Sequence, residues 1–286
     1  MRPSFAARWA AARLQTRVAP ELAAAPNQAV ARQILESAAP LPRRPAPAPA
    51  ARAFGGICGD WFETSGADRI LLYLHGGAFF AGSPELYRPL AGALAASGFH
   101  VFVPDYRLAP HPGPLDDARA VCAALMQTFG DIVIAGDSAG GGLAVSLMAA
   151  LHADGERFPC RAALFSPWTD YAVTGASARE NASRDALFSR QMLKIAGRAY
   201  LGGAGLAAAS PLHADLSGLP PMLVHAGRDE LLRDDATRLV DRARAAGVAA
   251  ELTLWPGVPH GWQFAAEFMP EAQESIAQAA AFLAGA

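Results

Sequence analysis

Residues 132–142 read Ile-Val-Ile-Ala-Gly-Asp-Ser-Ala-Gly-Gly-Gly, and residues 143–151 continue as a largely apolar stretch. An apolar run, a serine among small residues and a second apolar run predict a strand, a sharp turn and a helix, with Ser138 in the turn. The first turn of such a helix directs unpaired N–H groups toward the serine hydroxyl. The pattern is typical of a nucleophilic serine. A glycine-rich turn with a solvent-facing serine would look similar, so residues elsewhere must decide.

The composition indicates an ordered chain with a large core. It has 286 residues, of which 52% are hydrophobic and 17% are charged, which suits one α/β domain with insertions. A net charge of −2 gives no basis for nucleic-acid binding. Cys58, Cys122 and Cys160 are widely spaced, and the seven histidines show no metal-ligand spacing. We therefore expect neither a disulfide framework nor a metal site.

Short apolar runs alternate with helical patterns from Phe54 onward. This alternation predicts a mainly parallel sheet with helices on both faces, because parallel strands are joined by crossover helices. The expected strands are 70–75, 100–104, 132–135, 162–166, 222–226 and 251–255, and the expected helices are about 85–97, 116–129, 138–153, 235–246 and 271–284.

Two stretches do not follow the alternation. Residues 1–39 read as one or two alanine-rich helices, followed by a proline-rich linker at 40–49. Residues 166–219 contain no convincing strand and are too long for a plain crossover, which indicates an insertion over the active edge of the sheet. We therefore expect a helical cap made of residues 1–45 and 171–211, and a catalytic domain made of residues 46–170 and 212–286.

The first twenty residues carry several arginines among alanines, without the unbroken apolar core of a signal peptide. No segment reaches membrane-spanning length. A transit peptide stays open as an alternative, because acidic residues are absent until Glu21. We expect instead an amphipathic helix that packs on the domain of a cytoplasmic protein.

A serine nucleophile needs a base, and the base needs an acid that orients it. In an open parallel sheet both should follow the serine along the chain, each in a loop after a late strand. Asp229 and His260 occupy such positions, and the Pro-Gly-Val-Pro run before His260 would hold its loop in place. Glu230 is the alternative acid. We therefore predict a triad of Ser138, His260 and Asp229.

Donors for an oxyanion are expected where His75-Gly76-Gly77-Ala78-Phe79 follows an apolar run. Consecutive glycines let the backbone approach a substrate closely and direct N–H groups at a developing negative charge. We assign this role to the N–H groups of Gly76 and Gly77, together with that of Ala139 after the serine. A plain glycine turn between strand and helix is the alternative, and His75 is expected to orient the loop.

Five markers lie in order along the chain from residue 75 to residue 261. They are the segment 75–79, Asp-Tyr-Arg-Leu-Ala-Pro at 105–110, Gly-Asp-Ser-Ala-Gly at 136–140, Ser-Pro-Trp-Thr-Asp at 166–170, and His260-Gly261. With these markers the chain resembles the hormone-sensitive-lipase-like branch of the α/β-hydrolase esterases. The resemblance implies the α/β-hydrolase fold with a helical cap, hydrolysis of short-chain carboxylic esters, a small-molecule ester as partner and no cofactor. It also allows a homodimer. The acid segment that begins at Asp229 is one residue longer than the family's usual motif.

Phe79, Trp168 and Phe188 place bulky rings near the expected substrate pocket, although each could equally belong to the core. We therefore expect esters of butanoic to hexanoic acid to react faster than esters of dodecanoic or longer acids. The same catalytic residues could hydrolyse a lactone, an amide or a carbamate, because pocket shape selects the leaving group. A non-catalytic ligand-binding protein on this scaffold is a further alternative, against which His260 argues.

Overall fold

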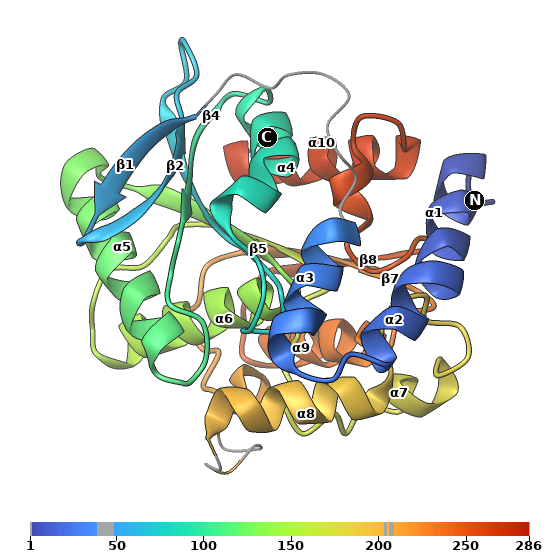
Figure 1. Ribbon diagram of the computed structural model, residues 1–286. Helices are drawn as coiled ribbons and strands as arrows, with labels where there is room; N and C mark the ends of the chain where they lie inside the picture. The colour runs from blue at the N-terminus through green and yellow to red at the C-terminus, as the bar shows by residue number, and fades with distance from the viewer. Residues whose placement is uncertain (1, 39–48, 203–204, 206–208, 286) are drawn as a thin grey trace.

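The computed structural model describes residues 2–38, 49–202, 205 and 209–285 (Figure 1). Its centre is an eight-stranded sheet with the strand order β1-β2-β4-β3-β5-β6-β7-β8. Strands β3 to β8 run parallel, whereas β2 is antiparallel to both β1 and β4. The strands are β1 (Ala50–Phe54), β2 (Ile57–Phe62), β3 (Arg69–Leu74), β4 (Phe99–Pro104), β5 (Ile132–Asp137), β6 (Ala162–Phe165), β7 (Met222–Gly227) and β8 (Ala250–Trp255).

The six strands expected from apolar runs are β3 to β8, so the predicted, mainly parallel sheet is confirmed. The hairpin of β1 and β2 was not among the expected strands. Four of the five residues of β1 are exposed, because this strand lies at the edge of the sheet and buries almost nothing. An edge strand of that kind leaves no apolar run in the sequence.

Alternate side chains of the central strands enter two separate hydrophobic cores. On β3, Leu72 and Leu74 belong to one core, while Leu71 and Tyr73 belong to the other. This division follows from the two-residue period of a strand. Because both faces of the sheet are covered, the parallel strands are apolar along almost their whole length.

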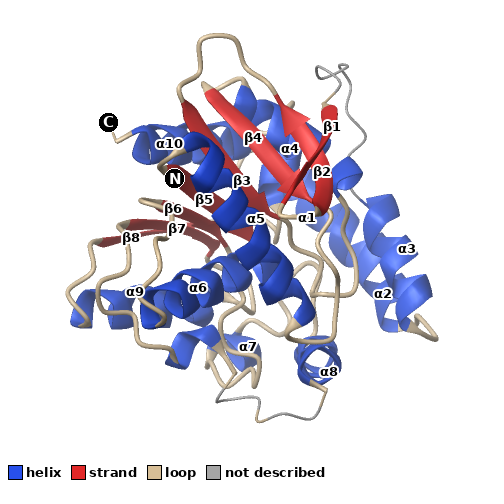
Figure 2. Ribbon diagram, turned by 90° about the vertical axis from the view of Figure 1, so that its left-hand side faces the viewer, coloured by secondary structure: helices blue, strands red, loops and turns tan. Residues whose placement is uncertain are grey.

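The helices cover the sheet from both sides. Residues of α5, α6 and α9 pack in the first core and residues of α4 and α10 in the second, and Figure 2 shows α6 and α9 on the opposite side of the sheet from α10. The helical bounds are α4 (Pro84–Ala95), α5 (Gly113–Phe129), α6 (Ser138–Ala153), α7 (Ser177–Glu180), α8 (Arg190–Leu201), η2 (Pro211–His213), α9 (Arg233–Ala245), η3 (Trp262–Ala265) and α10 (Pro270–Ala284).

The N-terminal residues form α1 (Phe5–Arg13), a π-helical turn η1 (Leu14–Val18), α2 (Ala19–Ala23) and α3 (Gln28–Ala38). Ser4 ties the start of α1 to the C-terminal part of the chain, because its N–H and its hydroxyl both donate to the carboxylate of Glu271, at 2.6 and 2.8 Å. Val18 and Leu22 pack with Leu187, which lies between β6 and β7. The N-terminal helices thus contact the long segment that interrupts the alternation.

Between β6 and β7 the described residues contain α7, α8 and the short helix η2, in agreement with a helical insertion. Leu193 and Tyr200 of α8 are buried.

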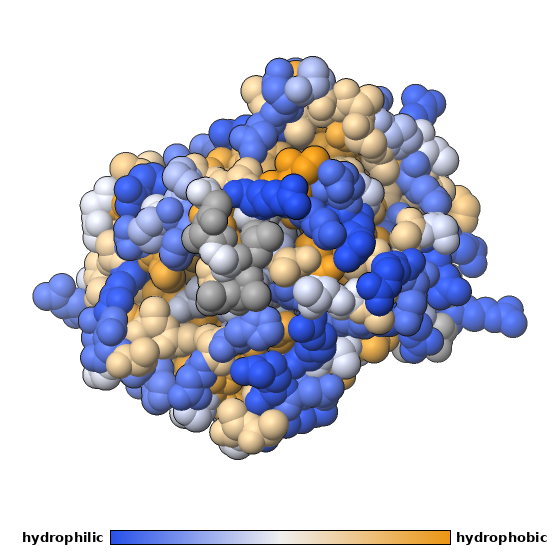
Figure 3. All heavy atoms as spheres, turned by 90° about the horizontal axis from the view of Figure 1, so that it is seen from below, coloured by the Kyte–Doolittle hydropathy of each residue, from blue (hydrophilic) through white to orange (hydrophobic). Residues whose placement is uncertain are grey.

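The face of the molecule seen from below in Figure 1 is mostly hydrophilic, with smaller hydrophobic areas between (Figure 3). The expected domain boundary at 45/46 and nearly all of the expected linker at 40–49 lie outside the described residues.

Candidate active site

Ser138 lies at the carboxyl end of β5, as the first residue of α6. Its φ angle is +51°, a conformation that non-glycine residues rarely adopt and that places the side chain at the tip of a sharp turn. A Cβ atom at Gly140 would meet the carbonyl oxygens of Leu74 and His75, and one at Gly136 would lie 2.6 Å from the carbonyl oxygen of Gly140. Both glycines are therefore required for the turn to pack against β3.

His260 lies in the loop after β8, and its carboxylate partner is Glu230. Nδ1 of His260 is 2.7 Å from Oε2 of Glu230. The other oxygen of Glu230 accepts two bonds of 2.7 Å, from the backbone N–H of Gly227 and from the hydroxyl of Ser166. Only 1% of the surface of Glu230 is exposed, and its three donors lie just after β6, at the end of β7 and in the loop after β8.

The prediction that Asp229 orients the base is wrong in this structure, which gives that contact to the alternative residue. β7 ends at Gly227, and Arg228 and Asp229 form a turn in which Asp229 is only half-buried. The chain then folds back, so that the longer side chain of Glu230 reaches both the strand end and His260. The acid segment is one residue longer than the family's usual motif, and this extra residue is the signal in the sequence that could have pointed to Glu230.

The carboxylates around His260 keep its ring ready to carry a proton. Burial lowers the pKa of His260, but the charge and hydrogen bond of Glu230, together with the charges of Asp185 and Asp137, outweigh burial and hold the pKa above its ordinary value. An imidazolium formed at this position would therefore be stabilised by its surroundings. That is the property required of a general base that must hold a proton briefly and then return it.

Asp137 connects the turn at Ser138 with the glycine loop after β3. Its carboxylate accepts hydrogen bonds from the hydroxyls of Tyr73 at 3.0 Å and Tyr87 at 2.9 Å, and from the N–H of Gly76 at 3.0 Å. Burial raises the pKa of Asp137, and the bond from Tyr87, the charge of His260 and the bonds from Tyr73 and Gly76 oppose that rise. The carboxylate is thus a structural anchor whose hydrogen-bonding capacity is already used.

This anchor also corrects the assignment of Gly76 as an oxyanion donor. The N–H of Gly76 donates to Asp137 and, at 2.7 Å, to the hydroxyl of Tyr87, so it is not available to a substrate. Gly77, Ala78 and Phe79 follow with φ angles of +114°, +53° and +64°. Within the described residues the N–H groups of Gly77 and Ala78 have no hydrogen-bond partner. The N–H groups that this loop leaves free for a ligand are therefore those of Gly77 and Ala78, one residue further along the chain than expected.

Ser138 and His260 line one cavity of about 710 Å³, together with Gly77 and Phe188. Its walls are otherwise mostly apolar and come from the N-terminal helices and from the chain after β8. The other lining residues are Phe5, Ala6, Trp9, Ala10, Arg13, Leu14, Leu35, Ser37, Ala38, Ala81, Gly82, Leu86, Tyr87, Asp137, Leu187, Pro259, Gly261, Trp262, Phe264, Ala265, Phe268 and Met269. A volume of this size suits a small organic molecule.

Two of the three predicted pocket residues do not line this cavity. The ring of Phe79 stacks on that of Tyr200, with centroids 3.7 Å apart. Trp168 is completely buried, and its indole N–H donates to the carbonyl oxygen of Asp170. Both belong to the core beneath the loops, whereas Phe188 lines the cavity and packs edge-on against the ring of His260.

Asp185 is a further, half-buried carboxylate beside the site, which the sequence did not reveal because no motif surrounds it. One of its oxygens accepts the N–H groups of Leu187 and Phe188, and the other accepts that of Leu231. It therefore joins the wall that carries Phe188 to the turn that carries Glu230. The ring of His75 stacks on that of Tyr106, and burial lowers its pKa to about 4. That His75 orients its loop stays a prediction.

Among the described residues, no cluster of three or more histidine, cysteine or carboxylate side chains has the arrangement of a metal site. In the same part of the chain, none of the helices has both the length and the apolar composition needed to cross a lipid bilayer.

Comparison with known proteins identifies the scaffold. A family model described as the alpha/beta hydrolase fold matches residues 71–264. An acetyl-hydrolase of Streptomyces hygroscopicus is 38% identical over 239 residues, which cover 80% of each chain. An esterase of Acinetobacter venetianus is 36% identical over 238 residues, covering 79% of this chain and 78% of its own.

Solved structures give the same result over nearly the whole chain. An esterase from the bacterial hormone-sensitive lipase family matches with a TM-score of 0.89 and 36% identity, covering 99% of this chain and 98% of its own. A hormone-sensitive lipase from a metagenome library matches with a TM-score of 0.87 and 36% identity, covering 95% of this chain and 97% of its own.

Proposed function

Because the chain belongs to the hormone-sensitive-lipase-like family of the α/β-hydrolase fold and is a carboxylesterase, we propose that it cleaves short-chain acyl esters through an acyl-enzyme on Ser138. The observation that carries this proposal is the pairing of His260 with Glu230 at the edge of the cavity that Ser138 lines. A nucleophile, a base and an orienting acid thus come together at the carboxyl ends of β5, β7 and β8.

The first half of the reaction forms the acyl-enzyme. The hydroxyl oxygen of Ser138 attacks the carbonyl carbon of the ester, while Nε2 of His260 takes the hydroxyl proton. Glu230 accepts the Nδ1–H of the ring, which leaves Nε2 free to act as the base and stabilises the imidazolium. The tetrahedral oxyanion accepts hydrogen bonds from the N–H groups of Gly77, Ala78 and Ala139, of which the last lies in the first turn of α6.

The first half ends when the tetrahedral intermediate collapses: its bond to the alcohol oxygen breaks, the imidazolium of His260 gives its proton to that oxygen, and the acyl group stays on Ser138. The second half returns the enzyme to its starting state. A water molecule then loses a proton to His260 and attacks the acyl carbonyl carbon. The second intermediate releases the carboxylic acid, and the proton returns to Ser138. Donor hydrogen bonds to an oxyanion are typically worth about 3 kcal/mol each.

We also propose the division into a cap and a catalytic domain, with residues 1–45 and 171–211 as the cap. Its support is that α1, α3 and Phe188 line the same cavity as Ser138. A wall of that kind limits the room for the acyl chain, and the preference for butanoic to hexanoic esters follows from it. A cytoplasmic location and a homodimer remain further proposals, which cell fractionation and sedimentation of the purified protein would test.

The experiment is hydrolysis of p-nitrophenyl butyrate by the wild-type and Ser138→Ala proteins, with circular dichroism as the check on folding. Ser138→Ala should abolish turnover and keep the wild-type spectrum, and activity at the wild-type level in this variant would refute the assignment. Labelling with a fluorophosphonate separates an activated serine from a ligand-binding scaffold, because only an activated Ser138 should react. A panel of lactones, amides and carbamates then shows whether esters are preferred.

A further inference from the structure

One cationic side chain reaches the catalytic cavity from the N-terminal helices. Arg13, the last residue of α1, is half-buried and lines the cavity that contains Ser138. Among the described residues that line this cavity, the other side chains that can carry a charge near neutral pH are His260 and Asp137. The carboxylate of Asp137 accepts its hydrogen bonds from Tyr73, Tyr87 and the N–H of Gly76, so Arg13 brings a positive charge that forms no ion pair with it.

The guanidinium of Arg13 has no carboxylate partner in the described part of the chain. Its one hydrogen bond goes from Nη1 to the carbonyl oxygen of Ala38 at the end of α3, at 2.9 Å. The segment that follows, residues 39–48, contains two arginines and no acidic residue, so its sequence offers no counter-ion. A guanidinium has five N–H donors in a planar fork, and burying part of its charge without an anion is unfavourable.

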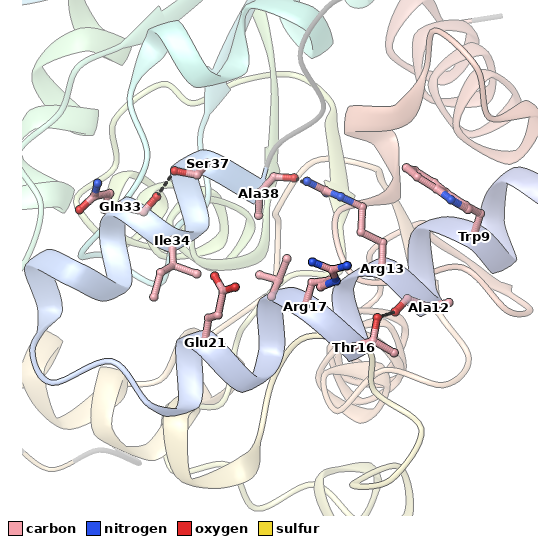
Figure 4. Close-up of a pocket in the computed structure, with 11 residues that line it drawn as sticks. Trp9, Ala12, Arg13, Thr16, Arg17, Glu21, Gln33, Ile34, Ser37 and Ala38 are labelled. Atoms are coloured by element: carbon pink, nitrogen blue, oxygen red, sulfur yellow. Dashed lines mark hydrogen bonds between the residues drawn. The ribbon is translucent and has the colours of Figure 1, made fainter.

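A neighbouring cavity of about 740 Å³ lies between α1, η1, α2 and α3 (Figure 4). The two cavities share Trp9, Arg13, Ser37 and Ala38, so Arg13 lies on the wall between them. Arg17 and Glu21 line only the second cavity, in which Figure 4 shows both side chains directed between the helices. Among the described residues that line the catalytic cavity, Arg13 is thus the one permanent cation, and it has no carboxylate partner.

We propose that Arg13 binds a carboxylate carried by the ester substrate, so that the enzyme prefers monoanionic esters such as the hemiesters of dicarboxylic acids. This inference rests on the proposed ester hydrolysis at Ser138. One guanidinium without an ion-pair partner matches one carboxylate, which favours a carboxylate over a doubly charged phosphate monoester. The apolar side chains of Leu14, Leu35 and Phe188 in the same cavity suit the methylene chain between the two carbonyl groups.

Two substrates of equal acyl length test the proposal: mono-p-nitrophenyl adipate, which ends in a carboxylate, and p-nitrophenyl hexanoate, which does not. The measured quantity is the ratio of their kcat/KM values. Arg13→Gln should lower this ratio by about tenfold to hundredfold, mainly through KM of the adipate ester, because a charge-assisted hydrogen bond is lost. Arg13→Lys, which keeps the charge, should recover part of it. Arg8→Gln, at an exposed position of α1 outside both cavities, should leave both substrates unchanged.

An unchanged ratio in Arg13→Gln would overturn the proposal, and so would an equal loss on both substrates, since that would mean that Arg13 only holds α3 through Ala38. Failure of the proposed function is recognised separately, as wild-type protein that hydrolyses neither ester. In that case the role of Arg13 is still tested by calorimetric titration of the Ser138→Ala protein with the adipate hemiester. Binding must then weaken by about tenfold or more when Arg13→Gln is added, and equal affinities would refute the role of Arg13.

Discussion

Exchanging Glu230 for glutamine tests which carboxylate orients the base. Oε1 of Glu230 accepts the N–H of Gly227 and the hydroxyl of Ser166, and Oε2 accepts Nδ1–H of His260. A glutamine has nearly the same shape and can keep its oxygen on the first two donors. Its NH₂ group then points at Nδ1 of His260, which must become an acceptor, so that the ring proton moves to Nε2.

The size of the effect follows from this change of tautomer. A ring with its proton on Nε2 cannot accept the proton of Ser138, and the imidazolium also loses the negative charge beside it. In serine hydrolases, replacing the orienting acid by its amide lowers kcat by about 10⁴-fold, which corresponds to about 5 kcal/mol of transition-state stabilisation. Because two of the three hydrogen bonds remain, the thermal unfolding curve of Glu230→Gln should stay close to that of the wild type.

The assay compares kcat/KM for p-nitrophenyl butyrate in the wild type, Glu230→Gln and the matched control Asp229→Asn, with thermal unfolding of each protein. Asp229 is half-buried in the turn after β7 and makes no recorded bond to His260 within the described residues, so its variant should stay within about twofold of the wild type. A Glu230→Gln enzyme with more than a tenth of wild-type activity would refute the reasoning. So would an Asp229→Asn enzyme that is as inactive as Glu230→Gln.

Three other predictions concern the site and its supports. The value of kcat/KM should fall as the pH decreases through the pKa of His260, because a protonated ring cannot accept the proton of Ser138. Glu230 and the neighbouring carboxylates hold this pKa above its ordinary value, and a pH–rate profile gives the midpoint. Tyr87→Phe should lower kcat about tenfold with little change in KM, because Asp137 loses a donor and the N–H of Gly76 loses its nearer acceptor; steady-state kinetics separates the two constants. Burial raises the pKa of Asp235 from 3.8 to about 7, so the folded chain binds this proton more tightly than the unfolded chain does. The free energy of unfolding should therefore fall as the pH rises across that interval, and urea titrations should show a smaller fall in Asp235→Asn.

The fold could be predicted from sequence where burial on both faces makes a strand continuously apolar. Strands β3 to β7 come close to that condition, whereas β8 lies at the other edge of the sheet and is only partly buried. All six were expected within a few residues of their observed bounds. The β1–β2 hairpin does not, because its outer strand is exposed at the edge of the sheet. Residues 5–38 could be predicted as helical, but their division into α1, η1, α2 and α3 depends on packing against Leu187 and the chain after β8, to which no local pattern points.

At the site, the sequence predicts those side chains whose place depends only on where the backbone turns. Ser138 is placed by the strand end and the two glycines, and His260 by the loop after β8. The identity of the acid depends instead on how far a side chain reaches after the chain has turned, and a sequence position next to a strand end does not contain that information. The oxyanion donors pose the same difficulty, because the direction of an N–H group depends on the φ angles of Gly77 and Ala78.

Buried and half-buried carboxylates explain why the loops around Ser138 hold these positions. Each of them accepts a hydrogen bond from a distant part of the chain: Asp137 from the N–H of Gly76, Glu230 from the hydroxyl of Ser166, Asp185 from the N–H of Leu231, and Asp235 from the N–H groups of Thr169 and Asp170. Bonds of this kind position loops without taking part in chemistry, and an amide of the same shape can accept most of them. Glu230 differs because it also contacts His260, so Glu230→Gln should preserve the fold and abolish the esterase activity. At the other three carboxylates the amide should cost far less activity, and that contrast separates the orienting acid from the structural ones.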